Sequence, residues 1–219
     1  MKREVKNQPV RKIGVKHRSV RGTVPKMGQY ESTLERDLME LIRFNPTVRS
    51  FLAQPLTIEY RTADGGKRKF TPDGLIHFNE GEPQQPSVLY EVKFRSDFRE
   101  QWKILMPKFR AAKAYCALRG WRFQVFTERE IRTPYLTNTK FLWSFLDRTP
   151  SPSAADRLIS ALAERGEATP ESILIYLSQS TASRIELIPV LWHLIAVGKI
   201  GCDLEKPLCM ASKIWKLED

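Results

Sequence analysis

The apolar pattern of the N-terminal half begins with a predicted helix. Over residues 32–44, leucine and isoleucine recur every three or four positions, which is the period of a helix with one buried face. Ser32 and Glu35 form a capping-box pattern at its start, and Asn45-Pro46 ends it. At about 100° per residue, Glu35 falls beside Ile42 at the edge of the buried face. The Glu35 carboxylate is therefore expected to face the protein body.

The segments that follow alternate between strand and helix patterns. Residues 56–61 and 69–78 are predicted strands joined by a turn at Asp64-Gly65-Gly66. The later predicted elements are a strand over 88–94, a helix over 97–118 and a strand over 122–126. Within that helix, Pro107 is expected to cause a break or kink, and Gly120 to end it. This order predicts an α/β fold in which a mixed sheet is flanked by helices.

The C-terminal third has a different pattern. Thr149-Pro150-Ser151-Pro152-Ser153 has the composition of a linker. Beyond it, residues 154–165, 170–178 and 184–197 are predicted helices, followed by a short segment at 199–204 that is suited to a small wing. The predicted organisation is a basic flexible arm at 1–28, an α/β domain at 29–148 and a small helical, winged-helix-like domain at 149–219.

The formal net charge of +11 is distributed unevenly. Residues 1–26 carry nine Lys or Arg and one acid, Glu4, whereas residues 151–219 carry a net charge of −2, which leaves +5 for residues 27–150. A strongly basic protein commonly binds polyanions, so the arm and the central domain are expected to face nucleic acid. The alternative for the arm is a solvated tail that has no partner.

The sequence indicates a reduced, intracellular protein. No apolar run is long enough to span a bilayer, and the basic N-terminus is not followed by the apolar stretch of a secretory signal. The three cysteines, Cys116, Cys202 and Cys209, form no CxxC pair, which favours free structural thiols over disulfides or a zinc site. The predicted location is the bacterial cytoplasm, with nucleoid association and no membrane contact.

A short set of polar residues interrupts the apolar strands. Asp73 follows Thr71-Pro72, and Glu91-Val92-Lys93 interrupts the strand predicted over 88–94. Side chains alternate along a strand, so Glu91 and Lys93 emerge on one face, and Asp73 joins them if the two strands pair. The alternative is an ion pair between Glu91 and Lys93 at a sheet edge, without any catalytic role.

The three residues suit metal-dependent phosphodiester hydrolysis. Carboxylates are the hard oxygen ligands that Mg²⁺ prefers, and the cation offsets the charge that builds up on the phosphoryl oxygens. Asp73 and Glu91 are the predicted Mg²⁺ ligands, and Mn²⁺ is expected to substitute. Glu35 is a further candidate ligand, and Glu31, one turn earlier, is its rival. Lys93 is expected to orient water or stabilise charge, with a pKa lowered by the metal and by burial.

These motifs resemble those of the PD-(D/E)xK nuclease superfamily. In this chain, the pattern consists of Pro72-Asp73 and Glu91-Val92-Lys93. Beyond them, the chain resembles TnsA-type transposon endonucleases over nearly its whole length. The segments that carry this wider resemblance are Ser32-Thr33-Leu34-Glu35, Asn45-Pro46-Thr47-Val48, Gln54-Pro55, Phe70-Thr71-Pro72-Asp73, Thr127-Glu128-Arg129-Glu130-Ile131-Arg132 and Tyr135-Leu136-x-Asn138. Asn45 replaces the usual Asp, a difference that is expected to affect helix termination.

The resemblance implies a restriction-endonuclease-like fold and a role in cut-and-paste transposition. Such a subunit of a heteromeric transposase cleaves the 5′ ends of the transposon while a DDE-type, TnsB-like transposase cuts the 3′ ends. It also implies that the C-terminal domain docks on a TnsC-like AAA+ ATPase; the alternative for this domain is contact with DNA. Carried over by position, Glu35, Asp73 and Lys93 match the family's catalytic residues, and Glu91 stands where some members have Gln.

Two other functions are compatible with the residues. A restriction or repair nuclease of the same fold would cut double-stranded DNA alone, and a non-catalytic assembly subunit would bind DNA without metal.

On the predicted helix 97–118, basic residues alternate with aromatic ones, and either line the DNA path or form a solvated face. These residues are Lys103, Lys108, Arg110 and Lys113 with Trp102, Phe109 and Tyr115. His77 is expected to be a hydrogen-bonded structural residue, and the absence of a GxxxxGK motif argues against ATP use.

Overall fold

The computed structural model describes residues 22–25, 27–81 and 84–217. The chain forms two compact units, residues 1–131 and 132–219, and each is described by itself. None of the helices in the described ranges combines the length and the apolar character that are needed to cross a bilayer.

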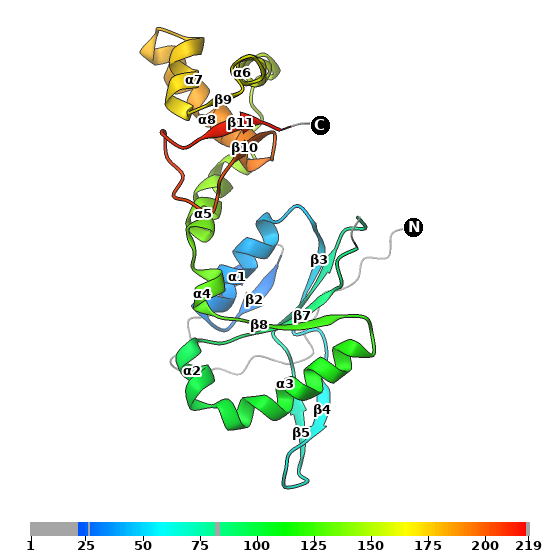
Figure 1. Cartoon of the computed structure of the whole chain (residues 1–219). Coiled ribbons are helices and arrows are strands. Elements are labelled where there is room, and N and C mark those ends of the chain that lie inside the picture. The colour runs from blue at the N-terminus through cyan, green and yellow to red at the C-terminus, as the bar shows by residue number, and fades with distance from the viewer. Residues whose placement is uncertain (1–21, 26, 82–83, 218–219) are drawn as a thin grey trace. The chain divides into compact units, whose positions relative to one another are not determined.

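A mixed sheet forms the centre of the first unit (Figure 1). Its strands are β3 (Val48–Ala53), β6 (Gly74–Phe78), β7 (Val88–Val92) and β8 (Arg122–Phe126), in the spatial order β3–β6–β7–β8. β6 is antiparallel to both of its neighbours, whereas β7 and β8 are parallel. All residues of β7 are buried, which is expected for a strand that is covered on both faces. The predicted α/β class with a mixed sheet is confirmed.

Helices cover the two faces of this sheet. Helix α1 (Thr33–Phe44) packs with Ile76 and Tyr90, and helix α3 (Trp102–Ala117) packs with Leu75 and Leu89. The two sets of sheet residues differ because neighbouring side chains along a strand point to opposite faces. Residues two positions after Leu89 therefore emerge on the α3 side of β7.

Helix α1 begins as its sequence predicts. Ser32 is the N-cap, and its hydroxyl oxygen accepts a hydrogen bond from the Glu35 N–H at 3.1 Å. Leu34, Leu38 and Ile42 are buried, which confirms the predicted stripe. At the other end, Asn45 is the C-cap, and its side-chain oxygen accepts hydrogen bonds from the N–H and hydroxyl of Thr47. Asn45 thus terminates the helix, as predicted.

The strand predicted over 69–78 is two strands in the structure. β5 (Lys67–Phe70) pairs with β4 (Ile58–Arg61) in a two-stranded hairpin, and β6 belongs to the central sheet. The break falls at Thr71-Pro72-Asp73, where Pro72 lacks the N–H that a continuous strand would use. The turn at Asp64-Gly65-Gly66 is confirmed, and Gly65 has a φ of +82°, which favours glycine.

The helix predicted over 97–118 is also divided, and not at Pro107. Helix α2 (Arg95–Glu100) ends at Gln101, which is at once its C-cap and the N-cap of α3. Pro107 lies within α3, where its ring removes one backbone hydrogen bond without ending the helix. Gly120, with a φ of +67°, follows α3 as predicted. Strand β3 was not among the predicted elements, because its exposed Arg49 and Ser50 hide the apolar alternation.

The predicted arm is shorter than residues 1–28. Strands β1 (Gly22–Val24) and β2 (Gly28–Tyr30) form a hairpin, and Val24 and Met27 are buried in the core beside α1. These two apolar residues anchor the segment, so residues 22–25 and 27–28 belong to the folded domain. The rest of the predicted arm, residues 1–21 and 26, lies outside the described residues.

The second unit contains a helix that the sequence did not reveal. Helix α5 (Pro134–Leu146) packs against α8, with Phe141 and Trp192 ring centroids 5.2 Å apart, so the compact units divide after Ile131 and not at the linker near residue 149. The side-chain amide of Asn138 donates to the Leu204 and Lys206 carbonyls and so joins α5 to the loop that contains them. Trp192, Leu194 and Ile195 are buried. The other elements are α6 (Pro152–Arg165), β9 (Glu167–Ala168), α7 (Pro170–Leu177), α8 (Thr181–Ala196), β10 (Ile200–Cys202) and β11 (Ile214–Lys216). Helices α6, α7 and α8, with the small sheet β10–β11–β9, match the predicted winged-helix-like outline.

Candidate active site

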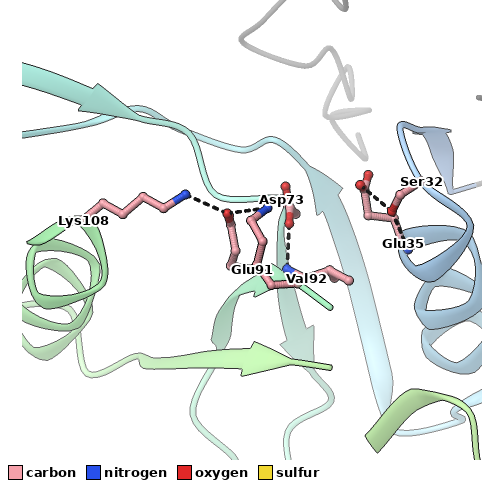
Figure 2. A network of polar contacts seen from close by, with 7 residues as sticks. Ser32, Glu35, Asp73, Glu91, Val92 and Lys108 are labelled. Carbon is pink, nitrogen blue, oxygen red and sulfur yellow. Dashed lines mark hydrogen bonds and ion pairs between the residues drawn. The ribbon is translucent and has the colours of Figure 1, made fainter. Parts of the chain in front are cut away.

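Asp73 is held at the break between β5 and β6 by bonds to the strands on both sides. Its N–H donates to the Tyr90 carbonyl at 3.1 Å, and its carbonyl accepts from the Gln54 N–H at 2.9 Å. Its Oδ2 accepts a hydrogen bond from the Val92 N–H at 2.7 Å (Figure 2). Backbone and side chain are thus both fixed next to β7.

Burial makes ionisation of Asp73 costly. Burial raises the pKa of its carboxyl well above the usual value, and the nearby Glu91 carboxylate raises this pKa further, whereas Lys93 lowers it. A buried carboxyl group with such neighbours gains from a cation beside it, because the cation favours the charged form.

Glu91 and Lys93 emerge on the α3 side of β7, as strand alternation predicts. Glu91 is 2% exposed, and its Oε1 lies 3.0 Å from the Lys93 ammonium. The same oxygen lies 3.0 Å from the ammonium of Lys108 on α3 (Figure 2). Within the described part of the chain, the buried Oε2 of Glu91 has no hydrogen-bond partner. Oε1 of Glu91 therefore contacts both ammonium groups, whereas Oε2 can still accept a hydrogen bond or bind a cation.

Lys93 is held in its charged form by these carboxylates. Burial alone would lower the pKa of its ammonium, but the charges of Glu91 and Asp73 outweigh burial, and the net effect raises the pKa. The sequence predicted a lowered pKa for Lys93, caused by burial and by a neighbouring metal cation. In the structure, beside the carboxylates of the chain alone, this pKa is raised, and Lys93 is a positively charged hydrogen-bond donor.

Lys108 belongs to this site, although the sequence analysis assigned it only to a basic helix. Its side chain is 18% exposed and its ammonium lies 4.7 Å from the centroid of the Phe70 ring. The signal was present in the spacing, because Lys108 is three residues after Leu105 and four before Ala112, both buried. A lysine within a buried helical stripe faces the protein body. Lys103, Arg110 and Lys113 are exposed, so they form the outer face of α3.

Glu35 reaches the same region from α1, but its carboxylate is engaged in capping. Oε1 accepts from the Ser32 hydroxyl at 2.8 Å, and Oε2 accepts from the Glu31 N–H at 3.0 Å. Burial raises the pKa of Glu35, and these two hydrogen bonds oppose the rise. Figure 2 shows Glu35 apart from the cluster of Asp73, Glu91 and Lys108. Ser32 caps the helix as predicted, but the Glu35 carboxylate accepts from the Glu31 N–H where a full capping box would use the Ser32 N–H. The predicted role of Glu35 as a metal ligand stays a prediction.

Gln54 is a second residue of the site that sequence reasoning did not assign. It has a φ of +45°, a left-handed conformation that costs energy for a residue with a side chain. Its amide donates to Glu31 Oε1 at 3.0 Å, and its own buried Oε1 is without a hydrogen-bond partner among the described residues. The Gln54-Pro55 segment was noted only as part of the family resemblance.

All four predicted site residues line one cavity of about 410 Å³. Glu35, Asp73, Glu91 and Lys93 line it together with the rival Glu31. In the described ranges, no three carboxylate, imidazole or thiol groups lie close enough together to hold a metal ion as a complete set. Asp73 and Glu91 still fit a hard divalent cation, because both are carboxylates that line the cavity and the buried Oε2 of Glu91 is an unused acceptor.

His77, His193 and the three cysteines are not among the residues that line this cavity. His77 Nδ1 is hydrogen-bonded to the Ser87 hydroxyl at 2.8 Å, which confirms the structural role that was predicted for it. The three cysteines are free thiols, as predicted. Cys209 is exposed, whereas Cys116 is buried.

The block at 127–132 has a structural function. It forms the short helix α4 (Glu128–Ile131), in which Ile131 is buried against α1. Glu128 Oε2 accepts from the Arg95 N–H at 3.0 Å at the start of α2. The block therefore fixes the chain directly after Lys93, whose N–H donates to the Phe126 carbonyl.

The comparisons with known proteins agree with this geometry. In a search of curated proteins, no match to the sequence was found. Residues 45–128 match a family described as TnsA-like endonuclease N terminal. This match includes Asp73, Glu91, Lys93 and Lys108, and Glu35 lies before it. Residues 45–128 are thus similar to a TnsA-like endonuclease N-terminal domain, which supports the resemblance to TnsA-type endonucleases.

Proposed function

We propose that this protein is the subunit of a heteromeric transposase that cleaves the 5′ ends of a transposon in a reaction that depends on Mg²⁺. The observation that carries the proposal is the convergence of Asp73, Glu91 and Lys93 on one cavity within the TnsA-like domain. Double-stranded DNA at the transposon ends is the proposed substrate.

Asp73 and Glu91 would hold the Mg²⁺ ion, with Mn²⁺ as a substitute. When bound, such an ion supplies charge stabilisation to the phosphoryl oxygens and lowers the pKa of a bound water. Glu91 would offer its unused Oε2, and Asp73 would offer the oxygen that does not accept from Val92. Glu35 would complete the set only by giving up its hydrogen bonds with Ser32 and Glu31.

The two lysines supply positive charge at the same oxygen of Glu91, Oε1. Lys93 would donate hydrogen bonds to water or to a phosphoryl oxygen, because its ammonium lies beside Glu91 in the same cavity. Lys108 neutralises Glu91 and lines the same cavity, so a phosphate that enters would lie within reach of both ammonium groups. Backbone bonds from Gln54 and Tyr90 keep Asp73 in place during the reaction.

The remaining parts of the proposal concern partners. A DDE-type, TnsB-like transposase would cut the 3′ ends, and a TnsC-like AAA+ ATPase would dock on the second unit. The acidic balance of residues 151–219 supports a protein partner over DNA for that unit, because a net charge of −2 repels phosphate.

Strand cleavage in the reconstituted system tests the proposal. Wild type, Asp73→Asn and Lys93→Met would each be combined with the transposase, the ATPase and end-labelled transposon DNA, with Mg²⁺ or with EDTA. We expect wild type to cut the 5′ strand only with Mg²⁺ and only with partners, and both variants to bind the partners but leave that strand intact. Cutting by the isolated protein would indicate a nuclease that acts alone, and cutting by Asp73→Asn at the wild-type rate would contradict the site.

A further inference from the structure

The β4–β5 hairpin carries an unbalanced positive face. Arg61 lies directly opposite Lys67 in the register, and Glu59 lies directly opposite Lys69. Residues that are directly opposite in an antiparallel pair, and residues two apart on one strand, share a face, so these four side chains project together. The face therefore holds three cations and one carboxylate.

The like charges on this face destabilise the hairpin. Lys69 forms an ion pair with Glu59 at 3.3 Å, and both side chains are more than 70% exposed. Next to this pair, Arg61 and Lys67 place two like charges opposite each other, which destabilises a two-stranded hairpin. An anionic partner that binds both side chains would relieve this repulsion.

The opposite face of the hairpin is anchored to the domain. Ile58 and Phe70 are buried in the core that α3 covers, and Tyr60 packs against it. The positive face therefore does not pack against the domain, and all four of its side chains are exposed to solvent. A rigid anchor with a charged outer face is suited to binding.

The positive face leads to the candidate active site. Lys69, on the positive face, lines the same cavity as Asp73 and Glu91. Lys69 is two residues from Lys67, so the row of cations runs from the turn of the hairpin to the mouth of the cavity. In Figure 1, β4 and β5 lie beside α3 and extend beyond it, with their turn on the side away from the central sheet.

We propose that Arg61, Lys67 and Lys69 bind the phosphate backbone of the DNA duplex next to the bond that is cut. The inference rests on the proposed function, because it takes the duplex that enters the cavity as the partner. Each cation that contacts a phosphate releases condensed counterions, so the affinity depends on salt in proportion to the number of contacts. The hairpin thus positions the duplex by its phosphates and reads no base sequence.

The test compares the salt dependence of DNA binding for two double variants of the full-length protein. Arg61→Ser/Lys67→Ser removes the like-charge pair of the hairpin. Arg119→Ser/Arg122→Ser removes equal charge at the other end of the sheet, where Arg122 pairs with Val88 at the start of β7. Binding of a short duplex would be measured by fluorescence anisotropy over a series of salt concentrations, with EDTA present to prevent cutting.

The hairpin variant is expected to lower the slope of log affinity against log salt by about two, and the control variant to keep the wild-type slope. Equal slopes for wild type and the hairpin variant, or equal losses in both variants, would overturn the inference. Absence of duplex binding by wild type would instead contradict the proposed function. Because the substituted side chains are exposed, both variants should fold, and Arg61→Lys/Lys67→Arg should retain the wild-type slope if charge alone matters.

Discussion

The ammonium group of Lys108 on α3 lies 3.0 Å from Oε1 of Glu91 on β7. This contact joins a helix residue to a strand residue across the wall of the candidate active site (Figure 2). It gives Glu91 a counter-charge beyond the one that Lys93 supplies, and it adds a residue to the site that lies outside the Asp73 and Glu91-Val92-Lys93 motifs.

Substitution of Lys108 by Met should separate metal affinity from catalysis. Without the competing ammonium, Mn²⁺ should bind more tightly, on the order of tenfold, because a cation near a divalent ion repels it. Cleavage in the reconstituted complex should fall by at least about tenfold, because the phosphate loses a positive contact. Calorimetric titration and end-labelled cleavage assays measure the two effects.

Lys108→Arg should restore much of the cleavage, and Lys113→Met, on the exposed face of α3, should leave Mn²⁺ affinity unchanged. If Lys108→Met weakens Mn²⁺ binding, Lys108 acts only as a structural support for Glu91.

Substitutions of Asp73 and Glu91 should have different effects on the free energy of unfolding. Asp73→Asn should leave the free energy of unfolding unchanged or raised, because burial already penalises the charge and the amide oxygen can still accept from Val92. Glu91→Gln should lower it by about 3 kcal/mol, because two partly buried ammonium groups lose their shared partner. Urea unfolding in EDTA measures both, and equal losses in the two variants would contradict this account of the charges.

Glu35 can be tested as a ligand separately from its capping role. Ser32→Ala should destabilise the protein by about 1 kcal/mol through the lost N-cap and still permit cleavage. Glu35→Gln keeps an oxygen that can accept from Glu31 N–H but removes the charge, so it should fold and lose cleavage if Glu35 binds metal. Wild-type cleavage by Glu35→Gln would leave Glu35 as a cap alone.

His77 gives the protein a pH dependence that is independent of catalysis. Burial lowers the pKa of His77 below its usual 6.5, and the nearby charge of Arg49 lowers it further. The folded state then binds a proton less readily than the unfolded chain, so stability is fully present above 6.5 and falls as the pH drops through the folded pKa. His77→Gln should reduce this loss in urea unfolding and should not change cleavage. An unaltered pH dependence in His77→Gln would exclude His77 as its source.

The sequence predicted local features of the site well because these depend on near neighbours. Ser32 and Glu35 lie three residues apart, so the cap of α1 follows from spacing. Glu91 and Lys93 share a face because strand side chains alternate. The pairing of Asp73 with β7 required only that consecutive strands form neighbours in the sheet.

Features that depend on tertiary packing were not predictable in the same way. The contact of Lys108 with Glu91 requires that α3 cross over the sheet in one particular register. The carboxylate of Glu35 could face either its own N-cap or the cavity, and spacing does not distinguish these rotamers. Likewise, α3 tolerates Pro107 because the rest of the helix is held by buried Leu105, Phe109 and Ala112.

Titration with Mn²⁺ tests most directly whether the carboxylates of Asp73 and Glu91 form one metal site. Isothermal calorimetry would compare wild type, Asp73→Asn, Glu91→Gln and His77→Gln under the same conditions. We predict saturable binding in wild type and His77→Gln, and none in Asp73→Asn or Glu91→Gln. Undiminished binding in Asp73→Asn or Glu91→Gln, or no binding in wild type, would contradict the metal-dependent nuclease.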